Sequence, residues 1–105
     1  MKQLSTEEFE ALIKDKEVKL LDVREKYEFA KGHIKGALLV PATDFWENFN
    51  QLKIKKTDKI ALYCRSGGRS DFIASELEAI GYTKVYNLEM GLLDWLDNKR
   101  EIVNG

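Results

Sequence analysis

The chain has 105 residues, with 17 lysines and arginines against 18 aspartates and glutamates, one histidine and one cysteine. Too few residues remain for a second core, so we expect one domain spanning residues 1–105. The net charge of −1 argues against binding of nucleic acid or an anionic membrane through overall charge. The single cysteine, Cys64, excludes an internal disulfide, a zinc site built from several cysteines and a second, resolving thiol in the same chain.

The first residues do not resemble an export signal. Met1–Gln3 leads directly into Leu4–Glu8, with no apolar segment behind the lysine. The longest apolar stretches, such as residues 37–40, are too short to cross a bilayer. We therefore expect a cytoplasmic protein, because reducing conditions there preserve a free thiol.

The first third of the chain predicts a helix, a strand and a second, shorter helix. Ser5 and Glu8 form an S-x-x-E capping box, and apolar residues follow at positions 9, 12 and 13, which is typical of a helix. Residues 18–23 (VKLLDV) predict a short buried strand. Residues 25–31 are expected to form one or two helical turns that end at Gly32.

The middle third predicts a strand and an aromatic helix. Residues 37–40 are expected to form a strand that Pro41 ends. Asp44 is placed to cap the helix that follows. The apolar side chains of this helix are Phe45, Trp46, Phe49 and Leu52. The basic stretch 53–59 is most simply a solvated connection, and steering of anions by its lysines is the alternative.

The last third predicts strand, loop, helix, strand and helix. The apolar run 60–63 (IALY) is typical of a strand covered on both faces. A helix is expected from about residue 70 to 80, with Gly81 as its C-terminal signal. A strand at 85–88 and a helix at 91–96 follow. The buried face of the helix at 70–80 is expected to consist of Phe72, Ile73, Leu77 and Ile80.

The alternation of strands and helices predicts an α/β fold. We expect an open, mostly parallel sheet of four to five strands with helices on both faces. Residues 99–105 are expected to be a C-terminal tail of weaker order. Ligands of such sheets bind beyond the carboxyl ends of the strands, and residues 64–70 occupy that place.

The loop after the central strand carries the sequence CRSGGRS, which predicts an anion site beside a nucleophile. Gly67 and Gly68 allow the backbone to curl and to turn its N–H groups inward, where they can bind an anion. The positive N-terminal end of the next helix points at the same place. Arg65 and Arg69 add two cations that can each donate a pair of hydrogen bonds to an oxyanion. All of these groups favour a thiolate at Cys64, so we expect the pKa of this thiol to be lowered.

Two other interpretations of the loop are weaker. A lone cysteine is often a buried structural residue, but inert packing does not call for two arginines and two glycines around Cys64. A nucleotide-binding loop requires a lysine after the glycines in the order G-K-[ST], and Arg69 stands in its place.

The chain resembles single-domain rhodanese-like sulfurtransferases, the thiosulfate sulfurtransferase family, from Leu4 to about Asp97. Three segments in order carry this resemblance. They are Asp22-Val23-Arg24-Glu25 with Tyr27-Glu28-Phe29 and Gly32-His33-Ile34-Lys35-Gly36-Ala37; the loop Cys64-Arg65-Ser66-Gly67-Gly68-Arg69-Ser70; and Gly91-Leu92-Leu93-Asp94-Trp95-Leu96.

The resemblance implies a two-step sulfur transfer and a rhodanese-like fold. Cys64 would attack the outer sulfur of thiosulfate or a similar small anionic donor and become a persulfide. Cyanide, a thiol or an acceptor protein would then remove the sulfur, with no metal or organic cofactor. The residues implied to bind the substrate are Arg65, Ser66, Gly67, Gly68 and Arg69.

A phosphatase or arsenate reductase is a less favoured alternative. Phosphatases that resemble rhodaneses carry a longer C-x5-R loop sized for phosphate, whereas Cys64 to Arg69 is C-x4-R. The loop also supplies no general acid for an alkoxide leaving group. A second alternative, from another functional class, is a persulfide carrier or regulatory interaction module with little thiosulfate turnover.

Several other polar and aromatic residues are assigned structural roles. Asp22 and Arg24 are expected to orient the neighbouring loop through hydrogen bonds and paired charges. His33 is expected to bond to the backbone rather than to activate the thiol. Three aromatic residues within five positions, 45, 46 and 49, cannot all face one core, so at least one of them is expected to be exposed. Core packing explains most of them, and part of an acceptor-docking surface is the alternative.

Overall fold

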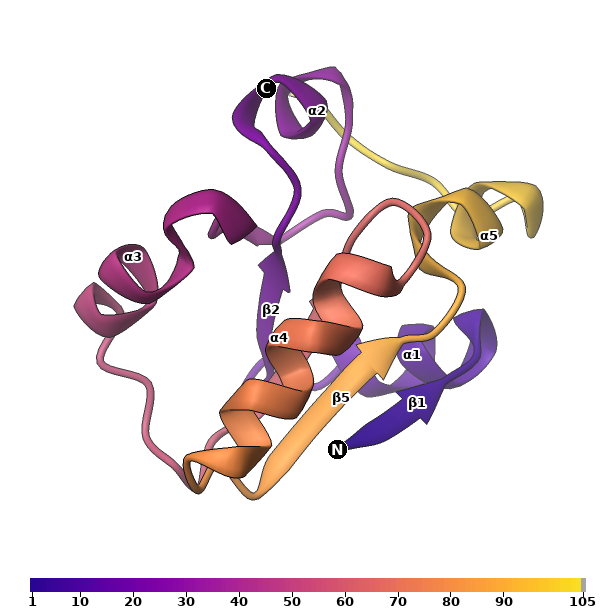
Figure 1. The fold of residues 1–105 in the computed structure, drawn as a ribbon. Coiled ribbons are helices and arrows are strands. Elements are labelled where there is room, and N and C mark those ends of the chain that lie inside the picture. Colours follow the sequence, from indigo (N-terminus) through magenta and orange to yellow (C-terminus); the bar gives the residue numbers. More distant parts are fainter. Residues whose placement is uncertain (105) are drawn as a thin grey trace.

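A computed structural model of the protein describes residues 1–104. Within them, strands alternate with helices along the chain (Figure 1). In chain order the elements are β1 (Lys2–Leu4), α1 (Thr6–Ile13), β2 (Lys19–Asp22), α2 (Lys26–Lys31), β3 (Leu38–Leu39), the 3-10 helix η1 (Ala42–Asp44), α3 (Phe45–Gln51), β4 (Lys59–Tyr63), α4 (Gly68–Ala79), β5 (Lys84–Leu88) and α5 (Gly91–Asp97).

The strands form one five-stranded sheet in the order β1-β5-β4-β2-β3, with every pair parallel. The predicted α/β class and the parallel sheet are therefore confirmed. The sequence did not indicate β1, which has three residues and forms one edge of the sheet. The strand expected at 37–40 is shorter than predicted, because only Leu38 and Leu39 pair with β2.

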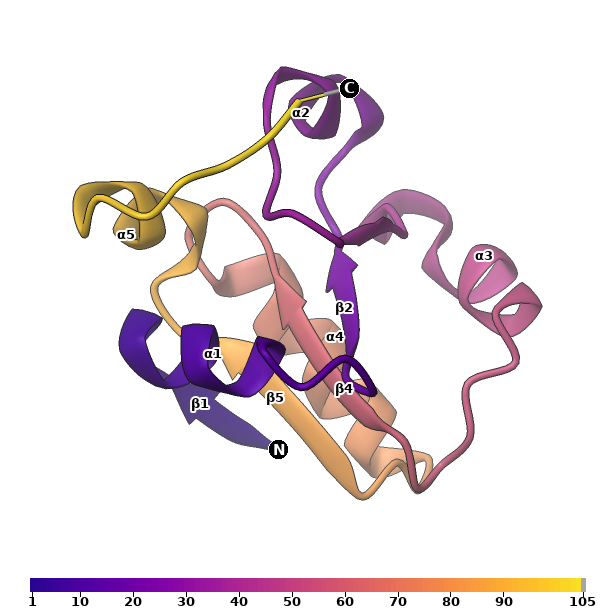
Figure 2. The same cartoon turned by 180° about the vertical axis from the view of Figure 1, so that it is seen from behind.

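Each face of the sheet is covered by a separate apolar core. Figure 1 shows α4 across one face, and Figure 2 shows α1 on the opposite face. Because side chains alternate along a strand, β4 contributes Ile60 and Leu62 to the core under α3 and α4, and Ala61 and Tyr63 to the core under α1 and α5. This burial on both sides explains the continuous apolar run in β4.

The helix α4 differs from its prediction in both its start and its buried face. It begins at Gly68 rather than near residue 70, and Phe72 and Ile80 are 66% and 49% exposed. Its buried residues are Ser70, Ile73, Ala74 and Leu77. These positions follow the i, i+3, i+4, i+7 spacing of one helical face. The buried face therefore includes the small residues Ser70 and Ala74 instead of the larger Phe72 and Ile80.

The helix caps follow the sequence in part. The capping box of Ser5 and Glu8 at the start of α1 is confirmed. Asp44 precedes α3, but its side chain makes no capping hydrogen bond, so its predicted role is wrong. The preceding residues 42–44 already form the 3-10 turn η1 that leads into α3.

The segment after α5, for which weaker order was expected, contacts the rest of the protein as far as it is described. Val103 pairs with His33 through two backbone hydrogen bonds of 2.8 Å. The indole N–H of Trp95 donates to the carbonyl oxygen of Glu101. The segment runs from α5 to the side of α2, as Figure 2 shows. No helix within residues 1–104 is long and apolar enough to span a bilayer.

Candidate active site

Residues 64–67 link the carboxyl end of β4 to the start of α4. β4 lies between β5 and β2, and its last residue, Tyr63, is fully buried. The start of α5 holds this loop from the side: the backbone N–H groups of Leu92 and Leu93 donate to the carbonyl oxygens of Cys64 and Arg65 at 2.9 and 3.0 Å. The loop therefore has a fixed shape at the end of the central strand, where the fold class places a ligand.

The Cys64 sulfur lies inside the curl of this loop. It accepts a hydrogen bond from the N–H of Gly67 at 3.1 Å and faces the N–H of Ser70 at 3.5 Å. The Ser70 hydroxyl is 3.4 Å from the sulfur and 3.2 Å from the carbonyl oxygen of Gly67. Cys64 is 1% exposed, so the thiol is buried at the base of the loop.

The ionisation of Cys64 follows from this environment. Burial raises the pKa of the thiol, but hydrogen bonds from the Ser70 hydroxyl and from the N–H groups of Ser70, Gly67 and Ser66 outweigh burial and lower it below its ordinary value. The expected direction is thus confirmed. The main stabilising groups are hydrogen-bond donors of the loop and of the first turn of α4, rather than the two arginines. Ser70 was not among the expected site residues.

The two glycines of the loop have different roles. Gly67 is left-handed, with φ of 101°, and a Cβ there would lie 2.0 Å from the carbonyl oxygen of Glu89. Gly68 is the first residue of α4, and a Cβ there would meet nothing within 4 Å. The expectation that both glycines provide conformational freedom is therefore correct only for Gly67.

The two arginines also differ, because only one is free of a carboxylate. Arg65 is exposed and forms no ion pair within residues 1–104. Arg69 forms a two-pronged ion pair with Glu28 of α2, with nitrogen–oxygen distances of 3.0 and 3.1 Å. Of the two cations that the sequence predicts, Arg69 is therefore paired with a carboxylate, and its binding of an anion stays a prediction. Glu28 could not be recognised as a site residue from the sequence, because its contact with Arg69 spans 41 positions.

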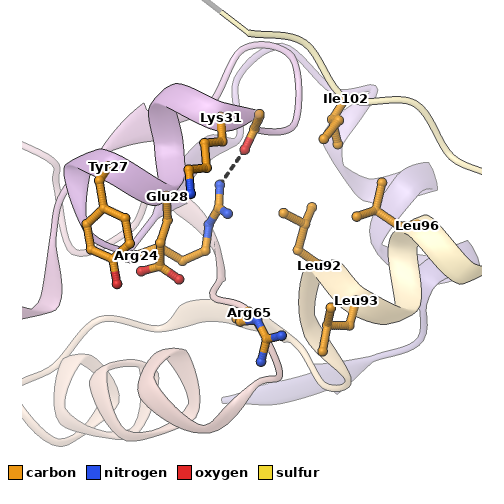
Figure 3. Close-up of a pocket in the computed structure, with 10 residues that line it drawn as sticks. Arg24, Tyr27, Glu28, Lys31, Arg65, Leu92, Leu93, Leu96 and Ile102 are labelled. Atoms are coloured by element: carbon orange, nitrogen blue, oxygen red, sulfur yellow. Dashed lines mark hydrogen bonds between the residues drawn. The ribbon is translucent and has the colours of Figure 1, made fainter.

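A cavity of about 430 Å³ lies between α2 and α5 beside the loop. Figure 3 shows Glu28 and Arg24 on one side of it, Leu92 and Leu93 on the other, and Arg65 between the two sides. The apolar part of its wall consists of Leu92, Leu93, Leu96 and Ile102. A second cavity of about 390 Å³ lies between α3 and α4, next to Gly68 and Arg69.

Asp22, Arg24 and His33 have the structural contacts expected of them. Nη2 of Arg24 donates to Oδ2 of Asp22 and to the carbonyl oxygen of Gly32, both at 2.7 Å, and all of these residues are buried. His33 Nδ1 lies 3.0 Å from the carbonyl oxygen of Phe29. These contacts connect the end of β2 to the end of α2 and so position Glu28.

The aromatic residues of α3 are mostly core. Phe45 and Phe49 are buried, whereas Trp46 is partly exposed and lines the second cavity, so one of the three is accessible as expected. Of the basic stretch, Lys59 pairs with Asp15 and Lys56 donates to the carbonyl oxygen of Ile80. Within residues 1–104, no three His, Cys, Asp or Glu side chains are grouped to hold a metal ion.

Comparison with known proteins gives one consistent family. Residues 5–98 match the rhodanese-like domain family. Among curated proteins, the chain is 40% identical to the uncharacterized protein YqhL of Bacillus subtilis over 96 residues, which is 90% of this chain and 72% of YqhL. It is 34% identical to the putative sulfur carrier protein YrkF of the same organism, covering 89% of this chain and half of YrkF. It is 33% identical to the tRNA uridine(34) hydroxylase of Bartonella quintana, covering 87% of this chain but only 32% of that protein.

Solved structures agree with these relatives. The crystal structure of a rhodanese-like domain protein from Staphylococcus aureus is 33% identical, with a TM-score of 0.78 over 90% of this chain and 91% of that one. The human single-domain sulfurtransferase TSTD1 is 26% identical, with a TM-score of 0.79 over 92% and 96% of the two chains.

Proposed function

Because the chain belongs to the rhodanese-like domain family, we propose that it is a sulfurtransferase that works through a persulfide on Cys64. The proposed reaction moves a sulfane sulfur from thiosulfate or a similar donor to a thiophilic acceptor. We further propose that it acts in the cytoplasm, where reducing conditions keep its only thiol available.

In the first step the Cys64 thiolate attacks the outer sulfur of the donor. With thiosulfate, a bond forms between Sγ and the outer sulfur, the sulfur–sulfur bond of the donor breaks, and its electron pair leaves with sulfite. Charge is conserved, because the thiolate and the thiosulfate dianion become a persulfide anion and a sulfite dianion. Arg65, Arg69 and the loop residues Ser66, Gly67 and Gly68 are the proposed ligands of the donor.

In the second step an acceptor removes the outer sulfur and regenerates the Cys64 thiolate. Cyanide would leave as thiocyanate, and a thiolate would leave as a new persulfide. The chain has no second cysteine, so the sulfur cannot be discharged through an internal disulfide. It has to pass to another molecule, which makes this a reaction with two separate substrates.

The observation that carries the proposal is the position of the Cys64 sulfur among loop hydrogen-bond donors. The N–H of Gly67 at 3.1 Å and the hydroxyl of Ser70 at 3.4 Å stabilise the negative charge that the thiolate carries on Sγ. An inert, packed cysteine needs no such donors, because a neutral thiol is a weak hydrogen-bond acceptor.

A second candidate is a persulfide carrier or interaction module with little thiosulfate turnover. The ion pair between Glu28 and Arg69 supports it, because this pair reduces the positive charge that a small dianion would meet. The curated relatives are compatible with either role, since one is named a putative sulfur carrier protein.

The test is cyanide-dependent formation of thiocyanate from thiosulfate by the purified protein, with Cys64→Ser as control. We expect turnover by the wild type and none by Cys64→Ser. Persulfide formation from a desulfurase with negligible thiosulfate turnover would favour the carrier. Rapid hydrolysis of an aryl phosphate without sulfur transfer would overturn both in favour of a phosphatase.

A further inference from the structure

The ion pair between Glu28 and Arg69 changes the charge of the active-site loop. Both guanidinium nitrogens, Nη1 and Nη2, donate to the two oxygens of the Glu28 carboxylate, at 3.0 and 3.1 Å. The Glu28 side chain is only 14% exposed, and that of Arg69 is 38% exposed. Such a two-pronged, partly buried contact is one of the stronger forms of ion pair.

Glu28 is held in this position independently of the arginine. Its Oε1 also accepts the backbone N–H of Glu25 at 2.9 Å, at the first turn of α2. The hydrogen bond from Arg69 lowers the pKa of Glu28, so the carboxylate is ionised at neutral pH. The negative charge of Glu28 is therefore fixed in the site, because the carboxylate is held by the backbone of α2 and is mostly buried.

The other cations around the cavity differ in whether a carboxylate neutralises them, and Lys31, which also lines the cavity, forms no ion pair within residues 1–104. Arg24 is paired with the buried carboxylate of Asp22 at 2.7 Å. Among the arginines of this site, Arg65 alone has no carboxylate partner within residues 1–104. A dianion placed beside the loop meets the uncompensated guanidinium of Arg65, the ammonium of Lys31 in the cavity wall and the Glu28 carboxylate. A monoanion meets the same groups with half the attraction to the cations and half the repulsion from Glu28, so the charge of Glu28 affects the binding of a dianion more than that of a monoanion.

The cavity next to Arg65 is suited to an organic group. Its volume of about 430 Å³ falls in the range of sites for small organic molecules, roughly 300–1,000 Å³. Leu93 and Leu96 of α5 face it while remaining exposed, so apolar surface is available there for a ligand to cover. Thiosulfate has no apolar part that could use this surface.

We propose that Glu28 is a specificity-determining residue, which acts through Arg69 to favour monoanionic organic sulfane-sulfur donors over dianionic thiosulfate. The donor class is an alkyl persulfide or thiosulfonate whose organic group occupies the cavity between α2 and α5. This inference rests on the proposed sulfur transfer and names its preferred substrate.

The chemistry of such a donor balances in the same way as that of thiosulfate. The Cys64 thiolate attacks the outer sulfur of methanethiosulfonate, the sulfur–sulfur bond of the donor breaks, and methanesulfinate leaves with the electron pair. Two monoanions become two monoanions, the Cys64 persulfide and the sulfinate. Because the same persulfide forms from either donor, the two donors differ only in charge and in the organic group.

The experiment compares kcat/KM for thiosulfate and for methanethiosulfonate, with cyanide as acceptor, in the wild type and Glu28→Gln. Glutamine keeps the shape of the side chain and removes its charge. We expect the ratio of thiosulfate to methanethiosulfonate to rise about tenfold in Glu28→Gln, because the second charge of thiosulfate then escapes repulsion. An unchanged ratio, with both donors still forming the persulfide, would overturn the inference and leave the sulfur transfer intact.

Glu8→Gln is a matched control. Glu8 accepts the N–H of Ser5 at 2.8 Å in the capping box of α1, as Glu28 does for Glu25 in α2, but within residues 1–104 it forms no ion pair with an arginine. We expect its ratio to stay within about twofold of the wild type. A rise in Glu8→Gln equal to that in Glu28→Gln would attribute the effect to general charge or helix stability and contradict the proposal.

A binding measurement tests the charge effect without turnover. In the Cys64→Ser background, Glu28→Gln is expected to tighten the dissociation constant for sulfate about tenfold more than that for methanesulfonate, measured by titration calorimetry. Equal effects on the two anions would overturn the inference. If neither donor loads Cys64 in the wild type, the proposed function fails, and calorimetry still decides the role of Glu28.

Discussion

The reactivity of Cys64 depends on a small number of hydrogen bonds. Ser70 supplies a hydroxyl and an N–H to the sulfur, and it is fully buried at the start of α4. The pKa of Cys64 is lowered despite burial, which by itself raises it. The thiolate is therefore present at a lower pH than in a free cysteine, and alkylation of Cys64 should reach its plateau at a lower pH.

We predict that Ser70→Ala raises the pKa of Cys64 and slows its alkylation by iodoacetamide about tenfold at pH 7. Loss of one hydrogen bond to a charged group costs about 1.5 kcal/mol, which corresponds to this change in the thiolate fraction. The measurement is the alkylation rate as a function of pH. Ser75→Ala, at an exposed position of the same helix, should leave the profile unchanged. A Ser70→Ala profile that coincides with the wild type would show that the hydroxyl does not stabilise the thiolate.

The sequence identifies part of this site because the relevant residues are neighbours in the chain. Cys64 and the curl at Gly67 follow from a glycine-containing loop after a buried strand, and the lowered pKa follows from the same pattern. The ion pair of Arg69 with Glu28 could not be derived, because it depends on how α2 is oriented over the loop. Local pattern indicates which cations are present, and only the fold decides which of them are neutralised.

At the scale of elements, the start of α4 depends on two adjacent glycines with different backbone requirements. Gly67→Ala is predicted to lower the free energy of unfolding by at least about 2 kcal/mol, because the left-handed backbone and the contact with Glu89 both oppose a Cβ. Gly68→Ala is the matched control and should stay within about 1 kcal/mol of the wild type. Urea unfolding measures both, and equal losses would contradict these different roles.

The elements themselves were predictable where the apolar pattern is strong. The helix α1 and the strand β4 are where they were expected, because a capping box and a continuous apolar run are local signals. The buried face of α4 was assigned incorrectly, since apolar side chains were favoured over small ones. Ser70 and Ala74 are buried because α4 packs closely on β4 and β5, and this requirement is visible only in the fold.

At the scale of the whole molecule, the buried pair of Asp22 and Arg24 connects the sheet to α2. Asp22→Asn is predicted to lower the free energy of unfolding by about 3–5 kcal/mol, because it leaves the Arg24 charge buried without a partner. Asp15→Asn, which affects a surface pair with Lys59, should cost less than about 1 kcal/mol. Similar losses in the two variants, measured by urea unfolding, would contradict a structural role for the buried pair.

The persulfide on Cys64 is the central claim, and intact mass spectrometry of the whole protein tests it most directly. The protein is incubated with thiosulfate or methanethiosulfonate and separated from the excess donor. Its intact mass is then measured before and after addition of cyanide. We expect the wild type to gain the mass of a single sulfur atom and to lose it to cyanide, while Cys64→Ser gains none. A wild-type mass that both donors leave unchanged, or an equal gain in Cys64→Ser, would contradict it.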